Sequence, residues 1–237
     1  MRRVVPLTTK QIASILLCSV LAASACGAED PAPTEATLRI FTDFPEAVDP
    51  SARFLIYLHG AIIERAGVRP THPEFGIYEY EEILEVFAER GFVVISEARP
   101  DGTDGMLYAA TVADQVRKLL AAGVRPEHIT VVGFSKGAGI AIAASSMLAH
   151  DDLNFVFMAA CNPWLDSRPE IIARGRLLSL RESSDELAGT CDGLFERSPN
   201  RRNQREVLLE LGGGHGMFYR PQAEWVDAVA DWAGFDQ

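Results

Sequence analysis

The sequence contains 237 residues, of which 48% are hydrophobic and 23% charged, and its formal net charge is −11. A chain of this length and composition can bury the core of a single globular domain without metal ions or several disulfides. The acidic balance argues against a nucleic-acid partner and says little about the substrate.

The first 25 residues have the pattern of an export signal. Arg2, Arg3 and Lys10 form a positive region, residues 12–23 form an apolar stretch, and Ala-Ser-Ala at residues 23–25 is typical of a cleavage site. We therefore predict a signal peptide over residues 1–25. Because the apolar stretch is short for a membrane span, a membrane anchor is the less favoured alternative.

Cleavage before Cys26 would expose a cysteine that is followed by an acidic, proline-rich stretch, for which we predict a disordered tether over residues 26–36. This arrangement resembles that of bacterial lipoproteins, in which such a cysteine carries the lipid. It departs from them at Ala23, where these signals usually have leucine. Export to the periplasm or cell surface is expected, and both lipid anchoring through Cys26 and simple secretion stay open.

From residue 37 onward, buried strand patterns alternate with helical patterns. Strands are expected at residues 37–41, 54–58, 92–96, 129–133, 155–160, 177–180 and 207–211. Helices are expected at residues 78–89, 108–122, 138–148 and 224–232, and a loop at residues 64–77. The alternation predicts an α/β domain over residues 37–237, with a mainly parallel, doubly wound sheet and helices on both faces. The short connection after residue 160 leaves no room for a cap domain.

The sequence G-F-S-K-G at residues 133–137 lies between a predicted strand and a predicted helix. Gly133 and Gly137 suit the close approach of strand and helix, and such a turn lifts the Ser135 hydroxyl clear of the sheet. The backbone N–H of Lys136 opens the helix, where free donors favour negative charge. Ser135 is therefore the predicted nucleophile, and the Lys136 N–H is one predicted donor to an oxyanion.

A base and an acid are expected further along the chain. His215 follows the last predicted strand on a glycine-rich loop and is the predicted general base. Asp185 lies on a serine-rich turn after the preceding strand and is the predicted acid, which would orient His215; a turn-capping role is the alternative. Glu182 is the main alternative acid, and Asp192 lies further along the loop.

The second oxyanion donor is expected just after the strand at residues 54–58, where His59, Gly60 and Ala61 follow. Gly60 allows the backbone to turn an N–H inward, and we expect this N–H to be that of Ala61, with Ile62 equally reachable. His59 is expected to stabilise this loop by hydrogen bonding rather than to take part in the chemistry.

The ordered set of His59-Gly60, the G-F-S-K-G elbow, Asp185 and His215 resembles the α/β-hydrolase superfamily, over essentially the whole chain after the predicted tether. The resemblance implies an α/β-hydrolase fold without a cap domain, similar to small dienelactone-hydrolase-like and carboxylesterase-like members. Dienelactone hydrolases use a cysteine nucleophile, and the serine here points away from that activity. The implied enzyme is a serine hydrolase that cleaves a carboxylic ester or thioester without a cofactor.

Lys136 departs from the usual residues at its position in the superfamily. Its side chain is expected to be solvated or paired with Asp185, Glu182 or Glu97, and a preference for an anionic acyl group is the less favoured interpretation. Non-catalytic binding on the same fold is the alternative function. Acyltransferase, peptidase or haloperoxidase chemistry would keep the fold and change the reaction.

Two cysteines remain in the predicted domain. Cys161 and Cys191 are expected to form a disulfide in an oxidising compartment, with two buried thiols as the alternative. No histidines or cysteines have the spacing of a metal site, since His59 and His72 have no nearby partner. The expected partner is a small ester or thioester, and the sequence indicates no oligomeric state.

Six large apolar side chains are expected near the mouth of the predicted site. Each is expected either to line an acyl pocket or, as the safer interpretation, to pack in the core. They are Phe75, Tyr78, Tyr80, Trp164, Met217 and Phe218.

Overall fold

The structure is a computed structural model that describes residues 38–199 and 201–234. The predicted signal peptide (1–25), the tether (26–36) and the lipidation site Cys26 lie outside the described residues. In the described part of the chain, no helix is long and apolar enough to cross a membrane.

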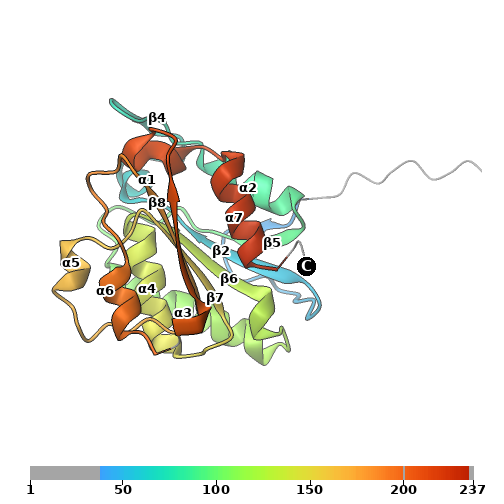
Figure 1. The fold of residues 1–237 in the computed structure, drawn as a ribbon. Coiled ribbons are helices and arrows are strands. Elements are labelled where there is room, and N and C mark those ends of the chain that lie inside the picture. Colours follow the sequence, from blue (N-terminus) through green and yellow to red (C-terminus); the bar gives the residue numbers. More distant parts are fainter. Residues whose placement is uncertain (1–37, 200, 235–237) are drawn as a thin grey trace, which may run out of the picture. The chain divides into compact units, whose positions relative to one another are not determined.

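Seven parallel strands form the central sheet (Figure 1). Their order across the sheet is β1 (Ile40–Phe41), β5 (Phe92–Ile95), β2 (Arg53–Leu58), β6 (Ile129–Phe134), β7 (Asn154–Met158), β8 (Arg176–Glu182) and β9 (Gln204–Leu209). The predicted parallel sheet is confirmed. Since all seven strands run the same way, their carboxyl ends meet at one edge, where ligands bind in sheets of this type.

Strand β2 illustrates why the sheet is buried on both faces. Phe54 and Ile56 point into one hydrophobic core, whereas the alternate residues Leu55 and Tyr57 point into the other. Each of these four side chains is fully buried. A continuous apolar run is therefore required here, in place of the alternating pattern of a half-exposed strand.

Helices cover both faces of the sheet, as predicted (Figure 1). One face packs against α3 (Gly105–Ala121), α4 (Lys136–Leu148) and the short helices α5 (Pro163–Asp166) and α6 (Asp192–Arg197). The other packs against α2 (Tyr80–Glu89), α7 (Ala223–Trp232) and a 3₁₀ helix, η3 (Gly214–Tyr219). Helix α4 is rich in alanine and glycine, which lets it pack closely against both α3 and the sheet.

Several short elements were not predicted. The predicted loop at residues 64–77 begins inside a helix, α1 (Ala61–Ala66), and also contains a small hairpin of β3 (Thr71–His72) and β4 (Gly76–Ile77). Helices α5 and α6 and the 3₁₀ helices η1 (Pro126–His128), η2 (Arg201–Asn203) and η3 are also additions. These elements span six residues or fewer, which is too short for a helical period to show in the sequence.

Helix α3 begins earlier than predicted because Asp104 caps it. The Oδ1 atom of Asp104 accepts hydrogen bonds from the N–H groups of Met106 and Leu107, at 2.8 and 3.0 Å. Such a side-chain cap satisfies donors that the first turn leaves free. The cap brings the start of α3 to the edge of the sheet at which the strands end.

Candidate functional site

Ser135 lies at the junction of β6 and α4 in a strained backbone conformation. Its φ of 53° and ψ of −117° lie in a region that residues other than glycine rarely adopt. The Ser135 N–H donates to the carbonyl of Met158 at 2.9 Å, and the Ser135 carbonyl accepts from the N–H of Ala138 at 2.9 Å. The neighbouring strand and the first turn of α4 thus hold the serine in this turn.

Two glycines allow the strand and helix to meet at this turn. A Cβ atom at Gly133 would lie 2.2 Å from the carbonyl oxygen of Gly137. A Cβ atom at Gly137 would lie 1.9 Å from the carbonyl oxygen of Leu58, on β2. Any side chain at either position would push the backbone apart, which is the steric reason expected from the sequence.

His215 and Asp185 complete a hydrogen-bonded chain with Ser135. The Nε2 atom of His215 lies 2.9 Å from the Ser135 Oγ, and its Nδ1 atom lies 2.9 Å from the Asp185 Oδ2. When the Nδ1 hydrogen faces the carboxylate, Nε2 is left as an acceptor for the serine hydroxyl. The three predicted triad residues, which come from the ends of β6, β8 and β9, are therefore brought together.

Asp185 combines both interpretations that the sequence allowed. Its Oδ1 atom accepts the N–H groups of Leu187 and Ala188 at 2.8 and 3.2 Å, which caps the turn, while Oδ2 faces His215. Burial raises the pKa of Asp185, but the hydrogen bond and charge of His215 and the two N–H groups outweigh it and lower the pKa. The carboxylate is ionised at neutral pH.

Glu182 does not reach His215. Strand β8 extends to this residue, and its buried carboxylate accepts the N–H groups of Ser184, Leu211 and Gly212 at 3.1 to 3.2 Å. Burial raises its pKa, but these N–H donors lower it overall. Glu182 therefore ties the end of β8 to the chain leading to His215, and the structure does not support it as the triad acid.

Two helix N-termini lie beside Ser135. Ala61 is the first residue of α1 and Lys136 the first of α4, and N–H groups in a first helical turn have no partner within their helix. A Cβ atom at Gly60 would lie 3.7 Å from the Ser135 Cβ, so the start of α1 is next to the serine turn. The Gly60 N–H itself donates to the Tyr78 hydroxyl at 3.4 Å. The Gly60 N–H is therefore not free to hold an oxyanion, and the lack of a side chain at Gly60 leaves room for the Phe134 ring, which a Cβ atom would approach to 2.9 Å.

The side chain of Lys136 pairs with a residue that we did not predict. Its Nζ atom lies 2.5 Å from Oε2 of Glu64 on α1 and 2.7 Å from the carbonyl oxygen of Thr103. All three expected carboxylate partners make other contacts; Glu97, for example, accepts the Tyr108 hydroxyl at 2.9 Å. An ion pair for Lys136 is as expected, but the three predicted partners are wrong, because the sequence predicts a loop at residue 64.

A cleft of about 580 Å³ opens at Ser135 and His215. This volume suits a small molecule. The start of α3, one side of α4 and the segment between β7 and β8 form its walls. Its large apolar lining residues are Met106, Ile140, Ile142, Trp164, Leu165 and Leu187.

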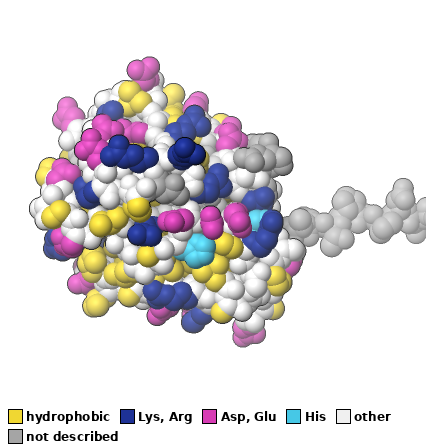
Figure 2. Space-filling model, turned by 60° about the horizontal axis from the view of Figure 1, so that its bottom comes forward, with side chains coloured by type: hydrophobic (Ala, Val, Ile, Leu, Met, Phe, Trp, Pro, Cys, Tyr) yellow, Lys and Arg dark blue, Asp and Glu magenta, His cyan; other side chains and the backbone are white. Residues whose placement is uncertain are grey.

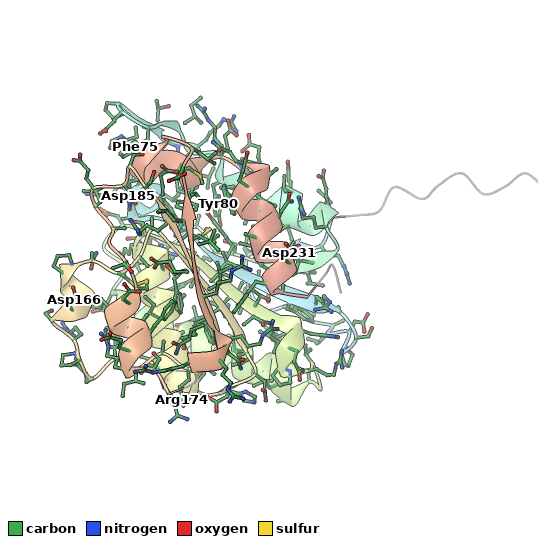
Figure 3. All side chains as sticks on the ribbon, in the orientation of Figure 1. Phe75, Tyr80, Asp166, Arg174, Asp185 and Asp231 are labelled. Carbon is green, nitrogen blue, oxygen red and sulfur yellow. A yellow bond between two sulfur atoms is a disulfide. The ribbon has the colours of Figure 1, made fainter. Side chains whose placement is uncertain are left out.

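Of the six side chains considered for an acyl pocket, Trp164 lines this cleft. Phe75 lies beside the site, with its ring centre 6.4 Å from that of His215, and Figure 3 shows it at the same end of the molecule as Asp185. The other four pack in the core, which is the role we considered safer. They are Tyr78, Tyr80, Met217 and Phe218.

A disulfide holds one wall of the cleft. Cys161, which follows β7 and lines the cleft, is bonded to Cys191 at the start of α6, with 5.2 Å between the two Cα atoms. The neighbouring Asp192, the more distant acid considered, is exposed on α6. The link thereby connects the β7–β8 segment to the chain that follows Asp185.

The described surface carries mixed charge. Figure 2 shows acidic and basic side chains interspersed on one face, with hydrophobic side chains between them. Within residues 38–199 and 201–234, no three His, Cys, Asp or Glu side chains gather closely enough to hold a metal ion.

Comparison with solved structures identifies the fold. SOBER1 of Arabidopsis thaliana matches with a TM-score of 0.51 at 13% identity, over 77% of this chain and 98% of that chain. A predicted CIB-like hydrolase from Thermoplasma acidophilum matches with a TM-score of 0.52 at 16% identity, over 78% of this chain and 88% of that chain. The esterase Pf2001 of Pyrococcus furiosus also gives 0.52, at 15% identity, over 78% and 81%.

The described chain has the α/β-hydrolase fold. The strand-turn-helix at Ser135 occupies the place of the nucleophile elbow in this fold, and His215 follows the last strand. Known family models do not match the sequence, and no curated protein matches it. Because the structural matches share so little sequence, they establish the fold alone.

Proposed function

We propose that this protein is a serine hydrolase that cleaves a carboxylic ester or thioester through an acyl-enzyme intermediate. The observation that carries this proposal is the pair of 2.9 Å contacts that link Ser135 to His215 and His215 to Asp185. The linked side chains open onto a cleft that can hold a small substrate. Two of the similar structures are named as a hydrolase and an esterase, which supports the proposal of a hydrolase.

The first half of the proposed reaction forms the acyl-enzyme. Ser135 Oγ attacks the carbonyl carbon while its proton moves to Nε2 of His215. The charge of Asp185 stabilises the imidazolium, and the N–H groups of Lys136 and Ala61 hold the carbonyl oxygen as it becomes negative. His215 then gives its proton to the departing alcohol or thiol as the bond to the carbonyl carbon breaks.

The second half releases the acid. Water attacks the acyl carbon as His215 takes one of its protons, and the bond between the acyl group and Ser135 Oγ then breaks. The proton returns from His215 to Ser135, which restores the starting state. In acyltransferase chemistry an alcohol or thiol would replace water, so product analysis with such acceptors separates the two.

We also propose export from the cytoplasm, with Cys26 as a candidate lipidation site. Support comes from the charged and apolar pattern of residues 1–25 and from the Cys161–Cys191 disulfide, which suits an oxidising compartment. Metabolic labelling with radioactive palmitate tests the anchor: label in the wild-type protein and none in Cys26→Ser supports it, whereas no label in either contradicts it.

Hydrolysis of p-nitrophenyl acetate and butyrate tests the proposed function. Ser135→Ala is expected to abolish turnover, because the variant lacks the attacking oxygen. It should leave the fold intact, because only one heavy atom is removed. Ser167→Ala is the matched control, since Ser167 is exposed and hydrogen-bonded to the Trp164 carbonyl, and it should keep wild-type rates. Full activity of Ser135→Ala contradicts the proposal, and an inactive wild-type protein would favour a binding function.

A further inference from the structure

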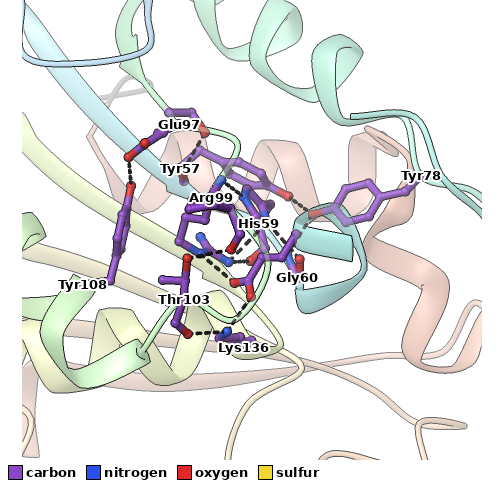
Figure 4. A network of polar contacts seen from close by, with 12 residues as sticks. Tyr57, His59, Gly60, Tyr78, Glu97, Arg99, Thr103, Tyr108 and Lys136 are labelled. Atoms are coloured by element: carbon purple, nitrogen blue, oxygen red, sulfur yellow. Dashed lines mark hydrogen bonds and ion pairs between the residues drawn. The ribbon is translucent and has the colours of Figure 1, made fainter. Parts of the chain in front are cut away.

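Arg99 is a buried cation at the edge of the sheet that holds the candidate site. Its side chain is fully buried, and its guanidinium donates to the His59 carbonyl and, at 3.0 Å, to Oε1 of Glu64. Its backbone N–H donates to Nε2 of His59 at 2.9 Å. Arg99 therefore contacts both the main chain and the ring of His59, as Figure 4 shows.

His59 in turn fixes the orientation of the peptide bond between Gly60 and Ala61. Since its Nε2 accepts from Arg99, its hydrogen is on Nδ1, which donates to the Gly60 carbonyl at 2.8 Å. Burial, followed by the charge of Arg99, lowers the pKa of His59 to about 3, which keeps the ring neutral. The Gly60 carbonyl and the Ala61 N–H belong to one planar trans peptide and point in opposite directions. Holding the carbonyl therefore aims the Ala61 N–H.

Glu64 connects this loop to the other N–H donor. Its side chain is 3% exposed, and its two oxygens have different partners. Oε1 accepts from Arg99, and Oε2 lies 2.5 Å from Nζ of Lys136. Lys136 supplies the second proposed donor from its backbone and Ala61 is three residues before Glu64 on α1. One carboxylate thus ties together the two helix starts that flank Ser135.

The ion pairs of this cluster act by fixing positions rather than by adding charge. Arg99 and Lys136 share the single carboxylate of Glu64, which leaves one positive charge in excess among these three side chains. Buried ion pairs often stabilise a fold no better than apolar side chains of the same volume. The cluster is therefore better explained by the positions that it fixes than by the stability that it adds.

We infer that Glu64, Arg99 and His59 are positioning residues, which set the direction and spacing of the Ala61 and Lys136 N–H donors. This inference rests on the proposed hydrolase function and deepens it. The three side chains act through the loop and helix starts, without contact with the substrate. Loss of the Glu64 charge should then weaken binding of the transition state more than binding of the substrate.

The test compares Glu64→Gln with Glu206→Gln. Glu206 is a matched control because it too pairs with an arginine, Arg181 at 3.5 Å, but on β8 and β9, and because glutamine keeps an oxygen that can accept the Cys191 N–H bound by Glu206. We would measure kcat and KM for p-nitrophenyl butyrate, and the affinity for a trifluoromethyl ketone that forms a tetrahedral adduct. Glu64→Gln should lower kcat and the ketone affinity by about 10- to 100-fold with KM nearly unchanged. Glu206→Gln should leave all three unchanged.

Wild-type kcat and ketone affinity in folded Glu64→Gln would overturn the inference. If that variant does not fold, Glu64→Asp replaces it, since it keeps the charge and shortens the reach; kcat should fall at least about fivefold. An unchanged kcat in Glu64→Asp is then the overturning result. Active wild-type protein with unaffected variants rejects this inference alone, whereas inactive wild-type protein without a reactive Ser135 rejects the proposed function as well.

Discussion

The Nδ1 atom of His215 lies 2.9 Å from Oδ2 of Asp185, while the carboxylate of Glu182, three residues earlier, is occupied by backbone N–H groups. Two acids on one turn thus have separate tasks. Asp185 faces the imidazole, and Glu182 joins the ends of two strands. The separation predicts opposite consequences for their amide variants.

Asp185→Asn should lower kcat by about 10³- to 10⁴-fold, because an amide cannot stabilise the imidazolium and favours the wrong tautomer of His215. The amide oxygen can still accept the N–H groups of Leu187 and Ala188, so the turn is expected to keep its cap. Steady-state kinetics with p-nitrophenyl butyrate measures the effect.

Glu182→Gln should show the reverse pattern. We expect kcat close to the wild-type value and a loss of about 1 to 3 kcal/mol in the free energy of unfolding, because a buried carboxylate loses its charge-assisted hydrogen bonds. Urea unfolding gives the free energy. If Glu182→Gln lost activity as severely as predicted for Asp185→Asn, and Asp185→Asn remained active, the assignment of the acid would be wrong.

The length of strand β8 explains why the sequence alone does not decide which of these two acids faces His215. The apolar pattern predicts a strand that ends at residue 180, but β8 continues for two more residues. This extension places Glu182 among the backbone donors at the strand ends. The three-residue step to Asp185 then reaches His215. Apolar periodicity does not show such an extension, because Arg181 and Glu182 are charged.

The ion pair of Lys136 is a second feature that the local sequence could not predict. Its position after Ser135 was read directly from the elbow sequence, but its partner Glu64 is 72 positions away. The chain contains 33 acidic residues, and nothing local distinguishes this one. Helix α1 has only six residues within a stretch rich in glycine and proline, so the face that it presents could not be predicted. The strand, turn and helix around Ser135, by contrast, follow from a local motif, although β6 ends one residue later and α4 begins two residues earlier than predicted.

His59 should contribute to the pH dependence of stability. Its pKa falls from 6.5 to about 3 on folding, so the unfolded chain binds a proton there, between these values, that the folded chain does not. The free energy of unfolding should therefore decrease as pH falls below 6.5, by at most about 1.4 kcal/mol per pH unit from this residue. Urea unfolding at pH 7.5 and pH 5 measures the decrease.

His59→Gln isolates the contribution of this residue. Glutamine does not titrate, and its carbonyl can accept the Arg99 N–H. The variant should therefore lose about 2 kcal/mol less than the wild-type protein between the two pH values. Equal losses in both proteins would show that His59 has the same affinity for protons in the folded and unfolded chains.

Removal of the disulfide should destabilise the protein. The double variant Cys161→Ala/Cys191→Ala opens a loop with a sequence separation of 30 residues, for which the chain-entropy estimate is about 3 to 4 kcal/mol. Because Cys161 lines the cleft, KM should also rise. Urea unfolding without added oxidant or reductant, which keeps the wild-type disulfide intact, measures the difference in the free energy of unfolding. Two free thiols in non-reducing mass spectrometry of the native protein would contradict the pairing.

Trp164 should determine how well longer chains bind in the cleft. Trp164→Ala is expected to lower kcat/KM for p-nitrophenyl octanoate by about 10-fold, through lost apolar contact, and to change the value for the acetate little. Leu107→Ala is the control, since Leu107 is 73% exposed on α3. An equal loss for both esters, or the same loss in the control, would show that Trp164 does not determine the preference for longer acyl chains.

Covalent labelling of Ser135 by a fluorophosphonate, followed by peptide mass spectrometry, tests the proposed nucleophile most directly. The reagent reacts with a serine that a neighbouring base activates. We predict one adduct, on Ser135, that is absent in Ser135→Ala and greatly slowed in His215→Ala. Folded wild-type protein that stays unlabelled, or that is labelled at another residue, would contradict the assignment of Ser135 as the nucleophile.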